Sequence, residues 1–158
     1  MNIYVGDGAK IRERIRKNHC TGNLEGSALR KHIASNLGFA ITKEKRPSGS
    51  TRGRLNIPNP MEGENNISNY LQSGEWKYLI CETAEIAKDF QFYVIQNLFP
   101  QPLLNVNMGS WNPNNENMYL AMLQELKNCI SLNYQETLNI PLLPGVYLFI
   151  HKKQPNEI

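Results

Sequence analysis

Two stretches at opposite ends of the chain decide the fold: residues 1–7 read MNIYVGD, and residues 144–150 read PGVYLFI. Each stretch is rich in β-branched and aromatic residues and is bounded by glycine or proline, a pattern typical of a short strand. We expect the first strand over residues 2–6, because Gly6, Asp7 and Gly8 form a turn signal. The second strand lies near the other end of the sequence.

Helical periodicity dominates the sequence between these strands. Ile11 and Ile15 are four residues apart and predict a helix over 9–19. Ser27, a good N-cap residue, predicts the start of a second helix that stops at Gly38. The same patterns predict a helical piece at 67–72, a strand at 76–81, and helices at 84–98 and 115–130. Residues 43–66 are rich in proline and glycine, and we expect them to form a long surface loop.

The composition favours one small α/β domain over the 158 residues. A hydrophobic share of 41% and a charged share of 20% are typical of globular proteins. No apolar run approaches the roughly 20 residues that a membrane helix needs, and no signal-peptide pattern is seen, so no membrane partner is expected. Three cysteines without CxxC spacing favour a reducing, cytoplasmic setting over a disulfide scaffold.

The charges are distributed unevenly along the chain. Residues 1–54 hold twelve Lys/Arg and four Asp/Glu, a net charge of +8, while the other 104 residues hold five Lys/Arg and ten Asp/Glu, a net charge of −5. This asymmetry indicates a face for a polyanion, most often nucleic acid. A solvated helix followed by a basic loop would give the same pattern, and the charges alone favour neither reading.

Residues 3–107 resemble the GIY-YIG nucleases. Tyr4-Val5-Gly6, followed ten residues later by Arg14, resembles the second half of the family's motif. The segment GNLEGSALR at 22–30 resembles a stretch that follows this arginine in one branch of the family. A strand, a helix and PLLN at 102–105 then follow in the family's order. The resemblance implies a small GIY-YIG-type domain with a three-stranded, mainly antiparallel sheet flanked by helices.

The first half of that motif, normally Gly-Ile-Tyr on a neighbouring antiparallel strand, does not precede Tyr4. PGVYLF at 144–149 resembles this strand in the form typical of excision-repair members. Joining residue 158 to residue 1 would leave fourteen residues between Tyr147 and Tyr4, enough for a hairpin.

We therefore expect one circularly permuted domain over 1–158. Residues 1–107 would carry the YIG half and the metal-ligand helix, 108–143 an extra helix and linker, and 144–152 the GIY-like strand. The alternatives are a dimer that lends its last strand to a partner and a chance similarity of the last strand to the motif.

The resemblance implies metal-assisted hydrolysis of DNA phosphodiester bonds, with one divalent ion, Mg²⁺ or Mn²⁺. Arg14 would bind a non-bridging phosphate oxygen, and Tyr4 or Tyr147 would orient or deprotonate the attacking water. His19 is a further acid/base candidate, although a solvated histidine at a helix C-terminus is an equal alternative. Gly6 and Asn105 would support the site.

Gln91 stands where the family has its metal-binding glutamate. A neutral amide supplies oxygen without the charge that a hard cation favours. Three explanations remain open: an inactive relative that only binds nucleic acid, a Glu→Gln exchange made to trap a substrate, or another acid serving as the ligand.

Basic residues of the first third of the chain are the expected nucleic-acid contacts, through a flexible loop and the helices before it. With Asn23, they are Lys10, Arg16, Lys17, Arg30, Lys43, Lys45, Arg46, Arg52 and Arg54. DNA is the expected partner, with RNA left open. The oligomeric state, monomer or homodimer with possible strand exchange, is also left open. The alternative function is a catalytically inactive nucleic-acid-binding module of the same fold, and a basic protein–protein adaptor is a third reading.

Overall fold

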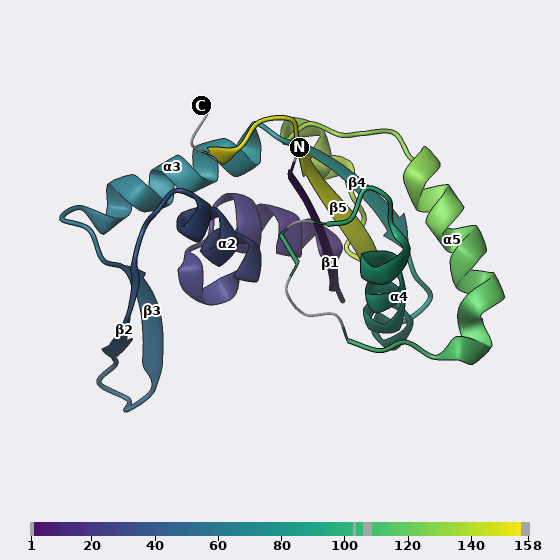
Figure 1. The fold of residues 1–158 in the computed structure, drawn as a ribbon, viewed down its shortest axis with the longest axis horizontal. Helices are drawn as coiled ribbons and strands as arrows, with labels where there is room; N and C mark the ends of the chain where they lie inside the picture. Colours follow the sequence, from purple (N-terminus) through teal and green to yellow (C-terminus); the bar gives the residue numbers. More distant parts are fainter. Residues whose placement is uncertain (1, 103, 106–108, 156–158) are drawn as a thin grey trace.

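The computed structural model describes residues 2–102, 104, 105 and 109–155. Its centre is a three-stranded antiparallel sheet of β1 (Asn2–Gly8), β5 (Gly145–His151) and β4 (Glu75–Ile80), in the order β1-β5-β4 (Figure 1). The last strand of the chain is therefore the central one. It pairs with β1 of the same chain from Asn2 opposite His151 to Gly8 opposite Gly145, so the expected pairing of the first and last strands is observed.

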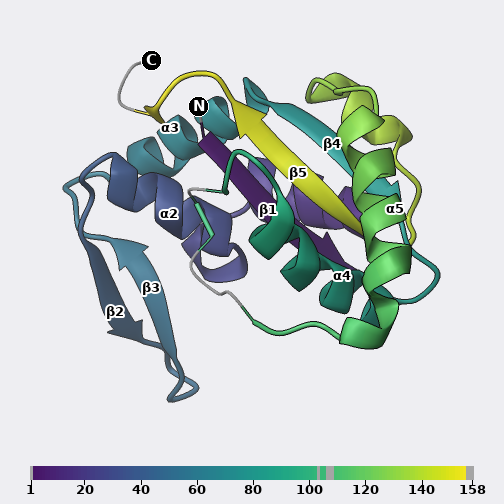
Figure 2. The same cartoon turned by 45° about the vertical axis from the view of Figure 1, so that its right-hand side comes forward.

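Helices cover both faces of the sheet (Figures 1 and 2). One face carries α1 (Ile11–Glu13), which continues into the π-helix η1 (Arg14–Cys20), together with α2 (Ala28–Asn36) and α3 (Pro60–Gln72). The other carries α4 (Ala84–Asn97) and α5 (Glu116–Asn128). The expected mixed α/β domain with a three-stranded antiparallel sheet flanked by helices is confirmed.

Alternation along the strands divides the core into two clusters. Tyr4, Tyr147 and Phe149 point towards the face of η1, α2 and α3. Val5 and Val146, their neighbours in sequence, point towards α4 and α5. Because successive side chains of a strand point to opposite faces, the two tyrosines necessarily share one face of the sheet.

The expectation of a long loop at 43–66 is wrong. It contains a hairpin of β2 (Ile41–Lys45) and β3 (Thr51–Leu55) and the start of α3. Gly49 has a φ of +93°, which lets the chain reverse between the strands. The hairpin extends away from the body of the domain (Figure 2).

α3 starts earlier than expected because Asn59 caps its N-terminus and Pro60 occupies its first turn. Short 3₁₀ segments complete the structure: η2 (Leu24–Gly26), η3 (Pro113–Asn115) and η4 (Gln135–Asn139). Within the described ranges, no helix is long and apolar enough to cross a membrane. The three cysteines are free; Cys20 and Cys81 are buried, and Cys129 is only half-buried.

Candidate functional site

Tyr147 is the centre of a polar cluster on the η1 side of the sheet. It lies opposite Gly6 in the β1–β5 ladder and is 1% exposed. A side chain at Gly6 would overlap the ring and hydroxyl of Tyr147, so the glycine makes the room that the tyrosine occupies. The Tyr-Val-Gly sequence and the tyrosine of the last strand are thus joined by direct packing.

His19 connects Tyr147 to the start of α2. Its Nε2 lies 2.5 Å from the Tyr147 hydroxyl oxygen, and its Nδ1 lies 2.6 Å from Ser27 Oγ. Ser27 Oγ also accepts the Arg30 N–H at 3.1 Å, as the N-cap of α2. In one tautomer of His19, Ser27 donates to Nδ1 and Nε2–H donates to Tyr147; in the other, Nδ1–H donates to Ser27 and the Tyr147 hydroxyl donates to Nε2. In the first tautomer, Tyr147 keeps its own hydroxyl hydrogen for a further acceptor.

Burial keeps this pair of side chains neutral. It lowers the pKa of His19 well below 6.5, and the Arg14 and Arg30 charges lower it further. Burial also raises the pKa of Tyr147 well above 10; ionisation of the neighbouring Tyr4 would add to the rise, while the Arg14 charge opposes it. Tyr147 therefore keeps its hydroxyl proton at neutral pH and does not act as a base there.

Arg14 reaches this cluster because η1 is a π-helix. In an α-helix, residues five apart lie about 140° apart around the axis, whereas a π-helix hydrogen-bonds residues five apart and places them on one side. Arg14 and His19 thereby face the same region. Arg14 is half-buried and donates to the Gly26 carbonyl at 2.7 Å. Its side chain also packs 3.5 Å from the position that a Cβ of Gly8 would take.

Tyr4 completes the cluster. Its ring meets the His19 ring edge-on, with centroids 5.9 Å apart, and it is 7% exposed. Burial raises its pKa, while Arg14 lowers it and Asp7 raises it. Tyr4, Arg14, His19 and Tyr147, predicted from separate parts of the sequence, therefore lie together.

Asn105 and Gln91 meet the outer edge of β1. The Asn105 side chain accepts the Val5 N–H at 2.7 Å and donates to the Val5 carbonyl at 2.9 Å, as a neighbouring strand would. The Gln91 amide donates to the same carbonyl at 3.4 Å. Asn105 thus supports the edge strand, and α4 brings Gln91 to it. Leu103 of the PLLN motif lies outside the described residues.

The side chains at this edge do not fit a divalent cation. Gln91 and Asn105 are neutral amides, and in the described part of the chain no three His, Cys, Asp or Glu residues form a group that could hold a metal ion. Burial raises the pKa of Asp7, and the Lys88 and Arg14 charges lower it. This single carboxylate therefore already lies near two cations. Two neutral amides and one carboxylate that already lies near cations differ from the group of carboxylates that Mg²⁺ prefers as ligands.

The expected nucleic-acid contacts separate into exposed and engaged residues. Arg30 is completely buried and donates to the His19 carbonyl, Ser68 and the Glu64 carbonyl, so its assignment as a nucleic-acid contact is wrong. Arg16 is half-buried; it donates to the Tyr134 carbonyl and Thr137 and lies 4.4 Å above the Tyr134 ring. Its guanidinium therefore already serves to pack η4.

The other basic candidates lie at or near the surface. Lys10, Asn23, Lys43 and Lys45 are exposed, and Lys17 is exposed beside Glu13 at 3.5 Å. Three arginines are paired with acids: Arg46 with Glu25, and Arg52 and Arg54 with Glu44. These pairs reduce the positive field of the hairpin below its formal count.

Two residues of the site were missed as functional residues by sequence reasoning. Ser27 was expected only as a helix cap, and Trp76 only as part of a strand. Trp76 is buried with its ring parallel to that of His19, at an interplanar angle of 11° and a centroid distance of 6.2 Å. The position of Ser27 was a usable signal. It caps the start of α2 only eight residues after His19, which lies near the end of η1, so the two side chains could be expected to lie close together.

Comparison with known proteins gives no significant match to any family model, curated protein or solved structure.

Proposed function

We propose that this chain is a circularly permuted GIY-YIG-type endonuclease, or its inactivated form, that acts on DNA phosphodiester bonds in the cytoplasm. The observation that supports it is the β1–β5 ladder, which brings Tyr4 and Tyr147 to one face of the sheet, where His19 and Arg14 of η1 lie against them. The proposal includes Mg²⁺ or Mn²⁺ as the metal of an active form and RNA as a possible substrate. It leaves the chain as a monomer or a homodimer.

Each residue of the cluster has a distinct task in this proposal. Arg14 binds a non-bridging phosphate oxygen through its planar guanidinium. Tyr147 donates its remaining hydroxyl hydrogen to an oxygen of the substrate or of the attacking water. His19, bonded to Ser27 through Nδ1 and to Tyr147 through Nε2, fixes the position of that hydroxyl. Tyr4 packs against the ring of His19 and limits the water that reaches it.

The second candidate is a nucleic-acid-binding module without catalysis, and Gln91 favours it. Its amide donates to the Val5 carbonyl and carries no charge for a cation. The polyanion would then lie along the exposed lysines of residues 10–45, while the tyrosine cluster would only position Arg14. Both candidates predict binding to DNA that weakens with salt.

The test compares plasmid cleavage by this chain with that by Gln91→Glu, in Mg²⁺ and in Mn²⁺. Gln96→Glu adds the same charge to an exposed position of the same helix and is the control. Cleavage by Gln91→Glu but not by Gln96→Glu supports an inactivated nuclease. Cleavage by neither, with salt-dependent binding, supports the binding module. Absence of DNA and RNA binding at low salt contradicts both.

A further inference from the structure

The β2–β3 hairpin leaves the body of the domain as a two-stranded ribbon (Figure 2). None of residues 41–54 is buried, whereas Leu55 at the base of β3 is 4% exposed. A side chain at Gly63 of α3 would overlap the Leu55 side chain, so the two residues lie in contact and anchor the ribbon. The core therefore does not depend on residues 41–54, which are exposed to a partner along their whole length.

The tip of the hairpin is closed and held beside η2. The Arg46 N–H donates to the Ser50 carbonyl at 2.8 Å. The Arg46 guanidinium pairs with Glu25 of η2. The carbonyl of the next residue, Gly26, accepts a hydrogen bond from Arg14 at 2.7 Å. η2 thus connects the hairpin to the tyrosine cluster, and a partner held by the hairpin is brought next to η2 and Arg14.

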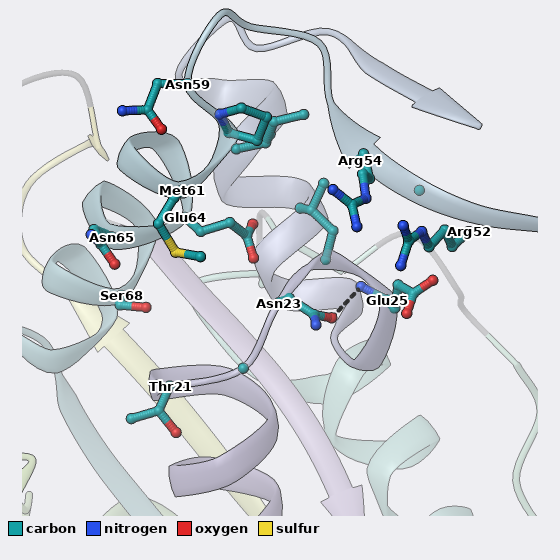
Figure 3. Close-up of a pocket in the computed structure, with 15 residues that line it drawn as sticks. Thr21, Asn23, Glu25, Arg52, Arg54, Asn59, Met61, Glu64, Asn65 and Ser68 are labelled. Carbon is teal, nitrogen blue, oxygen red and sulfur yellow. Dashed lines mark hydrogen bonds between the residues drawn. The ribbon is translucent and has the colours of Figure 1, made fainter. Parts of the chain in front are cut away.

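The two faces of the hairpin differ in how far their charges are neutralised. On one face, Arg52 and Arg54 both pair with Glu44. These two arginines line the pocket between η2, β3 and α3 (Figure 3). Strand alternation places Lys43 and Lys45 on the opposite face, called the lysine face below. Both lysines are exposed, and within the described residues neither forms an ion pair. The lysine face therefore carries two uncompensated positive charges.

The lysine face is shallow as well as basic. Gly53 lies opposite Lys43, and Thr51 lies opposite Lys45, so the second strand adds only small side chains next to the two lysines. Residues 41–55 contain no aromatic residue. Proteins that bind single strands stack the bases on aromatic side chains, which this hairpin lacks. Its charge and shape suit a polyanion with a groove better than an unpaired strand.

The width of the hairpin selects among grooves. Two paired strands lie about 4.8 Å apart before their side chains are added. The major groove of B-form DNA is about 12 Å wide and admits a two-stranded ribbon, whereas the minor groove is about 6 Å wide. The major groove of an RNA duplex is deep and narrow, and side chains do not reach its base edges.

We propose that the β2–β3 hairpin enters the major groove of B-form DNA, with the lysine face towards the DNA. Lys43 and Lys45 contact phosphates or base edges there, while Arg46 keeps the hairpin beside η2. The proposal deepens the proposed function and rests on it for the nucleic acid. It selects double-stranded DNA over RNA and makes the hairpin the element that docks it.

The first experiment measures binding by fluorescence anisotropy at constant salt. The probes are a DNA duplex of about 20 base pairs, roughly two turns, an RNA duplex of the same sequence, and one DNA strand alone. We expect the full chain to bind the DNA duplex at least about ten-fold more tightly than the other two. Equal affinity for the DNA and RNA duplexes overturns the proposal.

A second set of probes identifies the groove. Glucosylated 5-hydroxymethylcytosine in place of cytosine fills the major groove and leaves the backbone charge unchanged. It should weaken binding about ten-fold, because the hairpin is excluded. Distamycin, which fills the minor groove of an A·T-rich duplex, should compete little. Equal binding of the plain and glucosylated duplexes, or full competition by distamycin, contradicts entry into the major groove.

A shortened hairpin tests whether this element is responsible. Replacing residues 43–53 by Asn-Gly joins the strands through a two-residue turn and removes no buried residue. Urea unfolding shows whether the variant is folded. It should lose both the preference for DNA over the RNA duplex and the sensitivity to glucosylation. Retention of both by a folded variant overturns the proposal.

Two single exchanges test the orientation and do not depend on the shortened hairpin. Lys45→Gln and Arg54→Gln remove the same charge from opposite faces of the same ribbon. Lys45→Gln should weaken duplex binding about five-fold, as the loss of a phosphate contact does. Arg54→Gln should change it little, because Glu44 already offsets its charge. Equal effects of the two exchanges would contradict the assignment of the lysine face.

Failure of the hairpin and failure of the nuclease give different results. Unchanged duplex binding by the shortened variant, together with plasmid cleavage by Gln91→Glu, refutes the hairpin and leaves the nuclease standing. Binding that depends on the hairpin and the major groove, without cleavage by either form of residue 91, supports the hairpin and refutes the nuclease. A chain that binds no DNA refutes both.

Discussion

At the scale of single residues, the site depends on a close contact between a glycine and a tyrosine. Gly6 is not needed for a turn, since it lies within β1 and pairs with Tyr147. Its role is the absence of a side chain, which lets the Tyr147 hydroxyl lie against the strand and reach His19.

Gly6→Ala should therefore destabilise the protein by about 1–3 kcal/mol, the usual cost of overpacking a core. The added methyl group would overlap the Tyr147 ring. Urea unfolding measures the effect. Gly8→Ala is the control on the same strand, because its methyl group would lie 3.5 Å from the Arg14 Cβ, an ordinary contact. Equal stability of the two variants would contradict the packing argument.

The buried His19 predicts loss of stability in acid. Its pKa is held well below 6.5 in the folded protein, so only the unfolded chain takes up the proton near that pH. The stability that His19 contributes is complete above about pH 6.5 and falls by up to about 1.4 kcal/mol per pH unit below it. Urea unfolding at about pH 7.5 and 5.5 should show a smaller acid loss in His19→Gln than in the unchanged chain.

Other groups titrate in the same range. The pKa values of His32 and His151 are also lowered by burial, and those of Asp7 and Glu64 are raised by it. These groups are present in both proteins, so the difference between the two isolates His19. An equal acid loss in both would mean that His19 is charged or solvated in the folded state.

At the scale of elements, the start of α2 is also part of the site. Ser27 Oγ accepts the Arg30 N–H and contacts His19, whereas Thr83 Oγ1 only accepts the Ile86 N–H at the start of α4. Thr83→Ala should cost about 1 kcal/mol, as the loss of a cap does. Ser27→Ala should cost more, because it also leaves His19 Nδ1 without a partner in the interior. Equal losses, measured by urea unfolding, would show that the Ser27–His19 contact adds nothing.

Local patterns predicted the strands in which apolar and β-branched residues cluster between turn residues, and the helices in which apolar residues recur every three to four positions. Both motif strands and the helices at 84–98 and 115–130 lie within two residues of their expected bounds. The hairpin was missed because β2 is exposed along its whole length, so its residues show no alternation of apolar and polar side chains.

The gathering of Tyr4, Arg14, His19 and Tyr147 was predictable from the ordered motifs, since two paired strands bring their tyrosines to one face. The burial of Arg30 was not predictable. Its main partners, Ser68 and the Glu64 carbonyl, come from a helix more than thirty residues later, and nothing local distinguishes Arg30 from a solvated helical arginine.

At the scale of the whole molecule, the order of the strands in space differs from their order along the chain. β1 and β5 are neighbours with Asn2 opposite His151, so the first residue of β1 and the last residue of β5 lie side by side. Chains with adjacent ends tolerate permutation, and exposed turns tolerate new ends.

A chain in which residue 158 is joined to residue 1 and opened between Ser48 and Gly49 should therefore fold. Its far-UV circular dichroism and urea midpoint should stay close to those of the original chain. Opening it between Val146 and Tyr147, inside the central strand, is the contrasting cut and should abolish folding. Loss of folding in the first permutant would show that the β1–β5 ladder needs the present ends.

The uneven charge predicts how binding responds to salt. Lys43 and Lys45 are exposed on one face of the hairpin, next to each other on alternate positions of β2. Changing both to Gln should flatten the plot of log affinity for DNA against log salt by about 1.8, the contribution of two phosphate contacts. Lys127→Gln with Lys152→Gln removes the same charge elsewhere and should change the slope little. Equal changes would mean that net charge, and not the hairpin, sets the binding.

The parallel rings of Trp76 and His19 give the protein an optical probe of its own site. The chain has two tryptophans, and Trp111 lies against Tyr93 on the far side of the sheet. In Trp111→Phe, all indole fluorescence would come from Trp76, whose ring also lies 6.1 Å from that of Tyr147. The emission of a buried indole changes with the charge and polarity beside it. Titrating that single emission would therefore follow protonation of His19, or the arrival of a phosphate at Arg14, without any label.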